Sequence, residues 1–323
     1  MSFTGQPLRH PLAEKYYAAV DNVYEDGYVV TERGGITLPR DYVLDGQRIL
    51  DFPVRHDDVW VVTFPKSGTT WTQEMVWLLM NDLDFKSAKE KCISDRFPYL
   101  EHTALLPKGC RDGAVNTIDK AQHQPPPRLI KSHLPPVLLP KQLWTVKPKI
   151  VYVCRNPKDT AISYYHHRRL LMNMQLSVDE FIEAFLENVV NYSPYWSSAL
   201  EFWKLRNEPN VLWNTYEDMK KDLGAVIRKT AAFLGKSLTE EQVRQLEEHL
   251  SFSSMRDNPA TNYSAVVQRL RAGIGLPPAP PDQAFMREGA VGRARQRMSP
   301  EVDRRFDQWI RDNIRGTGYD GPI

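Results

Sequence analysis

The segment 64–71 places a lysine, a glycine and several hydroxyls directly after an apolar run, a combination that suits an anionic ligand. It reads Phe-Pro-Lys-Ser-Gly-Thr-Thr-Trp, so Pro65 and Gly68 predict a tight turn that opens a helix. The N–H groups at a helix start can cradle a phosphate, and Lys66 adds a positive charge. In the usual nucleoside-triphosphate loop the lysine follows the glycines, whereas here it precedes Gly68. We therefore expect a phosphate-binding turn of another kind, the alternative being an ordinary turn capped by its hydroxyls.

A histidine and a lysine follow a second apolar run, in the sequence Lys131-Ser132-His133. Because side chains alternate along a strand, Lys131 and His133 should point to the same face. A neutral imidazole in that position could take a proton from a hydroxyl group of a substrate. A single histidine is more often structural, but its place at the end of a strand, in the sheet that carries the phosphate turn, favours a catalytic role.

Two further apolar runs end in residues that could contact a nucleotide. Arg155 follows the third run and could bind an anionic group with two parallel hydrogen bonds. Ser163 lies about one turn into the helix that comes next and should face the same opening. The alternative is that Arg155 is a surface charge and Ser163 has no special role. Tyr216 follows the fourth run, and we expect either a contact to a base or phosphate or a half-buried strand aromatic.

The ends of the first three runs carry four basic or imidazole side chains but no lone Asp or Glu. A magnesium-dependent kinase or NTPase needs an acidic metal ligand after such a strand. This pattern favours a metal-independent transfer of a group that protein cations alone can stabilise. A sulfuryl group meets that condition because it carries less charge than a phosphoryl group.

The elements that must position these residues alternate along the chain. Four runs predict buried strands: Val59–Phe64, Leu129–Lys131, Ile150–Cys154 and Val211–Thr215. Helical patterns follow three of them: Thr70–Met80, Asp159–Met172 and Leu223–Leu234. Capping boxes that begin at Ser177 and Thr239 predict two more helices. We therefore expect an α/β fold in which helices flank a parallel sheet and ligands bind at the carboxyl ends of the strands.

We expect a single domain over residues 1–323, in which the weakly periodic segment Asn258–Gly292 is an active-site loop. The 42 basic and 40 acidic residues give a net charge of +2, too balanced for a protein held by a nucleic-acid backbone. No apolar stretch is long enough to cross a bilayer, and residues 1–15 do not resemble a secretory signal. Only three cysteines occur, an odd and sparse set typical of a reducing compartment, so we expect a cytoplasmic protein.

Together these residues resemble the cytosolic sulfotransferases, over nearly the whole chain from about residue 35 to residue 309. Four motifs in a specific order carry the resemblance: Pro65-Lys-Ser-Gly-Thr-Thr-Trp71, Lys131-Ser-His-Leu-Pro135, Arg155-Asn-Pro-Lys-Asp159 with Ser163, and Tyr216-Glu-Asp-Met219. The C-terminal segment 298–309 is more similar to insect members than to vertebrate ones. The resemblance implies transfer of a sulfuryl group from 3′-phosphoadenosine 5′-phosphosulfate (PAPS), which leaves 3′-phosphoadenosine 5′-phosphate (PAP).

The resemblance also implies a role for each matching residue. The turn 66–70 would hold the 5′-phosphosulfate, Trp71 and Phe252 would stack on adenine, and Arg155 with Ser163 would bind the 3′-phosphate. The residues implied to bind the nucleotide are Lys66, Ser67, Gly68, Thr69, Thr70, Trp71, Arg155, Ser163, Tyr216, Phe252, Met255, Arg287 and Gly289.

The chemical step follows from the same resemblance. His133 would be the general base, Lys131 would stabilise the transferred group, and Lys66 would neutralise the bridging oxygen as it leaves. The transfer would be in-line and would need no metal, so that positioning and preorganised charge supply the catalysis.

The sequence departs from the family pattern at the donor site. Arg287-Glu288-Gly289 stands where members carry Arg-Lys-Gly, and Gly292-Arg-Ala-Arg295 replaces Gly-x-Trp-Lys. Glu288 thus reverses one charge near a proposed anion, although Arg293 or Arg295 could compensate. Leu250 stands where Thr is common and removes one hydroxyl donor. A short vertebrate dimer motif is also absent, which leaves the oligomeric state open.

The resemblance implies an acceptor from the classes that the family uses, which are phenols, alcohols, steroids and amines. We expect a small molecule with a hydroxyl group, such as a phenol, an alcohol, a steroid or a catechol. Aromatic side chains that could line its pocket are Phe97, Tyr99, His102, Tyr192, Tyr195 and Trp196, of which we favour Tyr99, His102, Tyr192 and Trp196. Aromatic residues in such segments are more often core than pocket. His166 or His167 could also border the acceptor.

Three alternatives remain open from the sequence. A nucleotide kinase would keep the phosphate turn but needs an acidic metal ligand. A protein of the same fold could bind PAPS or PAP without turnover, although His133 and Lys131 argue against that. The third alternative is sulfation of an alcohol followed by elimination, a net dehydration.

Overall fold

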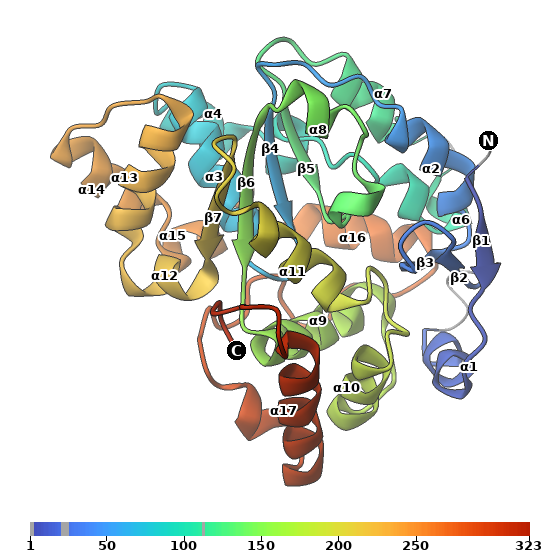
Figure 1. Ribbon diagram of the computed structural model, residues 1–323. Coiled ribbons are helices and arrows are strands. Elements are labelled where there is room, and N and C mark those ends of the chain that lie inside the picture. Colours follow the sequence, from blue (N-terminus) through green and yellow to red (C-terminus); the bar gives the residue numbers. More distant parts are fainter. Residues whose placement is uncertain (1–2, 21–25, 112–113) are drawn as a thin grey trace.

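The four apolar runs form one parallel sheet at the centre of the protein, in the order β5-β4-β6-β7 (Figure 1). This computed structural model describes residues 3–20, 26–111 and 114–323. The strands are β4 (Val59–Thr63), β5 (Leu129–Ser132), β6 (Lys149–Cys154) and β7 (Val211–Thr215). Each predicted strand is confirmed to within one residue at either end. The pairing aligns Val61 with both Lys131 and Val151, so the carboxyl ends of neighbouring strands lie together.

Two hydrophobic cores cover the two faces of this sheet. Val59 and Val61 pack into one core with α3 (Thr69–Met80) and α13 (Leu223–Leu234), while Trp60 and Val62 pack into the other. This second core includes side chains of α9 (Pro157–Met172), α10 (Val178–Leu186) and α17 (Pro300–Ile314). Strands that are buried on both faces need apolar residues at every position, which explains the continuous apolar runs in the sequence.

The helices follow the predictions closely. The helices α3, α9 and α13 begin and end within two residues of the expected bounds, and both capping boxes, at Ser177 and Thr239, form as expected. The other helices are α1 (Pro11–Ala18), α2 (Tyr42–Leu50), α4 (Phe85–Glu90), α5 (Ile93–Arg96), α6 (Lys108–Arg111), α7 (Thr117–Gln122), α8 (Leu143–Val146), α11 (Tyr195–Leu205), α12 (Tyr216–Lys221), α14 (Glu240–His249), α15 (Phe252–Asp257) and α16 (Ser264–Gly273), with 3-10 turns η1 (Thr103–Leu105), η2 (Pro136–Leu138) and η3 (Ala294–Arg297).

Two features differ from the sequence predictions. The segment 258–292 is not a loop throughout, because α16 forms within it and buries Val267 and Arg271. The Arg271 guanidinium donates to the carbonyl oxygens of Pro277 and Leu170, which fixes the helix on α9. A small antiparallel sheet, β1 (Gly5–Pro7), β2 (Tyr28–Thr31) and β3 (Thr37–Pro39), was not expected at all.

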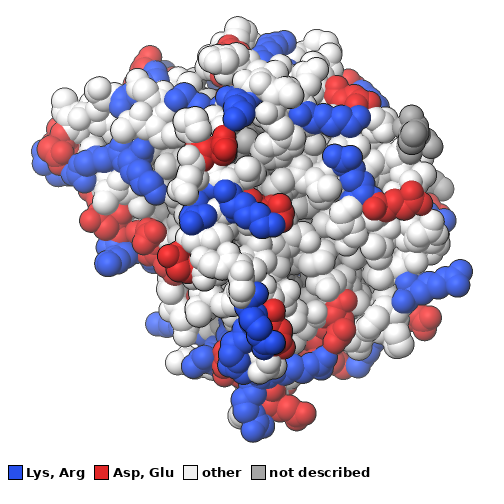
Figure 2. All heavy atoms as spheres, in the orientation of Figure 1, with Lys and Arg blue, Asp and Glu red and all other residues white. Residues whose placement is uncertain are grey.

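In Figure 1 the arrowheads of the central strands point down, with α16 at the middle of the view and α9 below it. Within the part of the chain that the structure describes, no helix is long and apolar enough to cross a membrane. On the face shown in Figure 2, Lys and Arg side chains are interspersed with Asp and Glu, in keeping with the balanced composition.

Candidate active site

A cavity of about 840 Å³ lies at the carboxyl ends of the central strands. Its walls include residues that follow all four strands: Lys66 after β4, His133 after β5, Arg155 after β6 and Tyr216 after β7. Lys131, within β5, also lines the cavity. The structure thus brings together the side chains that the sequence placed at separate strand ends.

The turn between β4 and α3 has the geometry of an anion cradle. Gly68 has a φ of 106°, and a Cβ there would stand 3.0 Å from the ring of Tyr216, so only glycine fits. The first helix hydrogen bond runs from the Thr72 N–H to the Gly68 carbonyl, at 3.0 Å. The N–H groups that precede Thr72 therefore have no partner in the preceding turn of the helix. Ser67 does not line the cavity: its hydroxyl is buried, and its N–H donates to Phe64. Ser67 therefore belongs to the turn, but its side chain lies outside the cavity lining.

Lys66 lies in the cavity wall close to other cations. Its Nζ is 3.9 Å from the centre of the Phe285 ring. Burial lowers the pKa of Lys66 to about 7, and the charges of Arg155, Lys131 and Arg287 act in the same direction. An anion bound at this turn would offset that repulsion and favour the charged ammonium.

The His133 imidazole is held in one tautomer by the strand beside it. Its Nδ1 is 2.8 Å from the backbone oxygen of Thr63. A carbonyl oxygen can only accept, so Nδ1 carries the hydrogen and Nε2 of the neutral ring keeps its lone pair. Burial, with Lys131 and Lys66 nearby, lowers the pKa of His133 well below its ordinary value. A neutral imidazole with a free Nε2 lone pair can accept a proton.

Glu101, which the sequence analysis did not identify, holds the end of β5 in place. Its two carboxylate oxygens accept from the Ser132 hydroxyl at 2.9 Å and from the His133 N–H at 2.7 Å. The Tyr192 hydroxyl donates to the same carboxylate at 3.4 Å, and it also bonds the Tyr99 hydroxyl. Burial raises the pKa of Glu101 to about 7, although the hydrogen bonds from His133 and Ser132 oppose that shift.

Lys131 and His133 share a wall of aromatic rings. The Lys131 Nζ lies 4.1 Å from the centre of the Tyr99 ring, and burial lowers the pKa of this lysine to about 8. The imidazole of His133 lies edge-on to Tyr99 at 5.2 Å and to Tyr192 at 5.6 Å. His102 stacks on Tyr99 and lines the cavity as well.

Arg155 links three segments around the cavity. Its guanidinium donates to the Lys66 carbonyl and to the Ala290 carbonyl, both at 3.1 Å, and lies 4.2 Å from the Tyr216 ring. Its Nε is buried without a partner. Ser163, on α9, lines the same cavity. Guanidinium N–H groups thus remain for an anionic ligand.

The other predicted nucleotide residues form one end of the cavity. The ring centres of Trp71 and Tyr216 lie 5.6 Å apart. Gly289 has a φ of 58°, and a Cβ there would come within 2.6 Å of the Phe252 ring. The cavity lining at this end includes Thr69, Thr70, Trp71, Tyr216, Leu250, Phe252, Met255, Arg287 and Gly289.

Of the four side chains favoured for the acceptor pocket, three lie at the cavity and one lies outside it. Tyr99, His102 and Tyr192 line the cavity, whereas Trp196 does not. Trp196 packs against Trp309 at 5.5 Å and belongs to the second core, because the first turn of α11 faces the C-terminal helix rather than the strand ends. Of the two other aromatic residues considered, Phe97 is core, and the Tyr195 hydroxyl donates to the Arg155 carbonyl.

The lining also includes Phe285 and, on α16, Leu270, which the sequence analysis did not single out. His166 and His167 on α9, which it named as possible neighbours of the acceptor, line the cavity as well. Burial lowers the pKa of His167 well below its ordinary value, and its Nδ1 is buried without a partner. Leu270 lies on α16, whose periodicity in the sequence is too weak to have singled it out.

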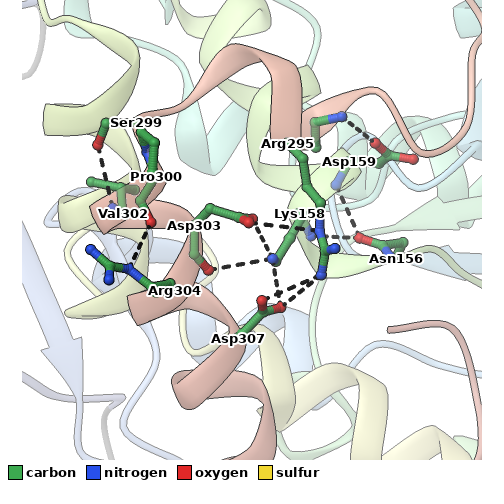
Figure 3. A network of polar contacts seen from close by, with 11 residues as sticks. Asn156, Lys158, Asp159, Arg295, Ser299, Pro300, Val302, Asp303, Arg304 and Asp307 are labelled. Carbon is green, nitrogen blue, oxygen red and sulfur yellow. Dashed lines mark hydrogen bonds and ion pairs between the residues drawn. The ribbon is translucent and has the colours of Figure 1, made fainter.

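The segment that follows Phe285 is fixed on α9 and α17 by a network of charges (Figure 3). The Asp159 carboxylate accepts from the N–H groups of Gly292 at 2.7 Å and of Ala294 at 3.2 Å. Lys158 pairs with Asp303 and, at 2.6 Å, with Asp307. In the described part of the chain, no group of three or more His, Cys, Asp or Glu side chains could hold a metal ion.

Comparison with known proteins agrees with this geometry. The sulfotransferase domain family matches residues 56–318. The chain is 40% identical to luciferin sulfotransferase of the insect Photinus pyralis, over 90% of this chain and 81% of that protein. It is 33% identical to human (Homo sapiens) sulfotransferase 1E1, over 85% of this chain and 89% of that protein.

Solved structures give the same result. A retinol dehydratase, crystallised with retinol and PAP, superposes with a TM-score of 0.89 at 32% identity and covers 100% of this chain and 99% of its own. Mouse sulfotransferase SULT7A1 with PAP gives a TM-score of 0.68 at 27% identity, over 87% of this chain and 92% of its own. The chain belongs to the sulfotransferase family, with an insect-type sequence, and it is a PAPS-dependent sulfotransferase.

Proposed function

We propose that this enzyme transfers the sulfuryl group of PAPS to the hydroxyl of a small uncharged acceptor, with His133 as the general base. The observation that carries the proposal is the Nδ1 hydrogen bond from His133 to Thr63. This bond leaves Nε2 as the proton acceptor, in a cavity that Lys66 and Lys131 also line.

The donor fits the cavity through residues of several elements. The N–H groups at the start of α3, together with Lys66, would hold its phosphosulfate. Arg155, with its unpartnered Nε, and Ser163 would bind the 3′-phosphate. The aromatic rings of Trp71 and Phe252 would enclose the adenine.

Each reactive residue then has one task. The His133 Nε2 accepts the proton of the acceptor hydroxyl as its oxygen bonds to sulfur. Lys66 neutralises the bridging oxygen while the bond between that oxygen and sulfur breaks, and PAP is the leaving group. Lys131 stabilises the negative charge on the transferred group. Positioned charges of this kind act without reorganisation at the moment of reaction.

The charges around the cavity favour an uncharged acceptor. Among the described residues, three carboxylates line the cavity: Asp95, Asp159 and Glu288. Asp95 pairs with Lys120 at 2.7 Å, Asp159 accepts two backbone N–H groups, and Glu288 pairs with two arginines. A cationic amine would therefore meet no unpaired carboxylate in this lining, whereas a neutral phenol or alcohol needs none.

The test is acceptor-dependent release of PAP from PAPS, with a panel of phenols, alcohols and catechols and with a chelator present. We expect release at an unchanged rate when the chelator is added. His133→Ala should lower turnover by about 10²-fold or more, because a general base contributes that much, while PAP affinity stays near the wild-type value.

His123→Ala is the matched control, because His123 is exposed and lies outside the cavity. An active His133→Ala enzyme would show that another group takes the proton. The wild-type protein could instead bind PAP and yet form none from PAPS with any acceptor of the panel. That result would mean that the fold serves PAP binding without turnover.

Net dehydration of an alcohol is a second candidate outcome of the same chemistry, and the comparison with one solved structure favours it. The solved structure that superposes with a TM-score of 0.89 is named a retinol dehydratase and was crystallised with retinol. Sulfation of an allylic alcohol gives a good leaving group, and loss of that sulfate together with a proton yields an alkene and inorganic sulfate. Product analysis with retinol separates the two outcomes: a stable sulfate ester supports transfer alone, whereas an alkene with free sulfate supports dehydration.

A further inference from the structure

Glu288 lies between two arginines at the edge of the donor end of the cavity. Its Oε1 bonds the Arg287 guanidinium and accepts from Arg297 at 2.7 Å. All three side chains line the cavity and are partly exposed, at 28% for Arg287, 27% for Glu288 and 46% for Arg297. One carboxylate oxygen therefore engages two cations in a cavity that has to accept a polyanion.

The backbone that follows Glu288 is fixed, so the carboxylate stays at the edge of the cavity. On the C-terminal side, Arg155 donates to the Ala290 carbonyl, and Asp159 accepts from the Gly292 and Ala294 N–H groups. Figure 3 shows how the Lys158 network secures the chain beyond that point on α17. The adjacent Gly289 backbone packs against the Phe252 ring.

The electrostatic surroundings explain why a carboxylate is tolerated at this position. Burial lowers the pKa of Arg287 from its ordinary value; Glu288 opposes that shift, and Arg297 and Arg155 reinforce it. Arg287 also contributes to the low pKa of Lys66. Glu288 is thus a counter-ion inside a cluster of mutually repelling cations. A phosphate dianion would play the same part and would need the same guanidinium N–H groups.

We propose that the Glu288 carboxylate competes with the 3′-phosphate of the donor for the guanidinium groups of Arg287 and Arg297. This competition lowers the affinity for PAPS and PAP. This inference rests on the proposed function, in which the 3′-phosphate binds beside Arg155. When the nucleotide enters, the arginines exchange the Glu288 carboxylate for the phosphate, and the like charges repel. Binding is weaker than the cations alone would allow, and release of PAP is easier.

The experiment is calorimetric titration of PAP and of 5′-AMP, which lacks the 3′-phosphate, into the full-length protein. We expect Glu288→Gln to bind PAP about threefold to fivefold more tightly, because a change of this size corresponds to the free energy of one partly exposed ion pair. The affinity for 5′-AMP should change little. Glu288→Ala should act in the same direction, which guards against an effect peculiar to glutamine. The KM for PAPS should fall in parallel.

Asp282→Asn is the matched control, since Asp282 is exposed in the same segment, lies outside the cavity lining and loses the same charge. Its PAP affinity should stay within about twofold of the wild type, because exposed charges at a distance are screened.

Each other result would overturn the inference. Unchanged or weaker PAP binding by both Glu288 variants would mean that the carboxylate orders the arginines for the phosphate instead of competing with it. An equal gain for 5′-AMP, or in Asp282→Asn, would show a general charge effect. If the wild-type protein binds no PAP at all, the proposed function fails together with the inference, and that result is distinct from the others.

Discussion

The environment of Lys66 in the free protein favours its neutral form, whereas its proposed role requires the charged form. Burial and three nearby cations lower the pKa of its ammonium to about 7, yet the proposed chemistry needs that ammonium charged beside the leaving oxygen. Binding of an anionic nucleotide resolves the conflict, because negative charge favours the protonated form. The affinity for the nucleotide must then depend on pH.

We expect the affinity for PAP to fall as the pH rises through about 7 and then about 8, where Lys66 and Lys131 lose their protons in the free enzyme. The sign follows because the nucleotide raises both pKa values, so binding above pH 7 takes up protons. Titration at pH 8 in two buffers of different ionisation enthalpy measures this uptake.

Lys66→Arg is the control for that prediction, since arginine keeps its charge throughout this pH range. Proton uptake at pH 8 should decrease in this variant, and its PAP affinity should change less between pH 6.5 and pH 8. A wild-type affinity that does not vary over this range would show that Lys66 stays charged in the free enzyme.

The sequence alone located the residues that follow strands, because strand ends can be read from apolar runs. Lys66, His133 and Arg155 were found in this way, and all three line the cavity. Glu101 was missed because no apolar run leads to it; the bridge of Tyr99 to Lys131 brings it beside β5. Trp196 was wrongly placed because an aromatic residue at a helix start serves a core as well as a pocket.

At the level of elements, the strand-helix pairs were predictable and the segment after α15 was not. The helix α16 shows weak periodicity because it covers the cavity rather than a core, so only part of one face is apolar. The strands β1, β2 and β3 are three or four residues long, which is too short for an alternating pattern to be recognised.

The close approach of the 287–292 backbone to Phe252 yields a prediction at this scale. Gly289→Ala should weaken PAP binding, because its Cβ would meet the Phe252 ring at 2.6 Å and push apart the wall of the proposed adenine site. Gly292→Ala is the matched control: Gly292 has a φ of 75°, but a Cβ there meets nothing within 4 Å. Both variants carry a backbone strain of about 1 kcal/mol, so any difference in PAP affinity reports the contact with Phe252.

At the scale of the whole molecule, Lys158 connects α9 to the C-terminal helix α17, two helices that lie far apart in the sequence (Figure 3). It is 5% exposed and pairs with Asp303 and Asp307. Lys158→Ala should lower the free energy of unfolding by about 1–3 kcal/mol, because Asp303 and Asp307 lose their buried cation and keep only the more exposed Arg295.

Denaturant unfolding measures this effect. Lys204→Ala serves as the comparison, since its pair with Glu201 is exposed at 64% and 49% and should contribute at most about 0.5 kcal/mol. Equal losses of stability in the two variants would mean that the contact between the helices is held by apolar packing alone.

Thr63 has a consequence for how this enzyme can change. Its carbonyl holds the His133 ring, its hydroxyl lies 2.6 Å from that of Thr69, and the phosphate turn begins at the next residue. The spacing between the proposed base and the phosphate turn is therefore set by one short piece of backbone, while Leu270 lines the cavity from α16, a separate stretch of chain. Substitutions at Leu270 should therefore alter the range of acceptors without disturbing the alignment of the proposed reacting groups, so new substrate preferences can evolve on an unchanged reaction centre.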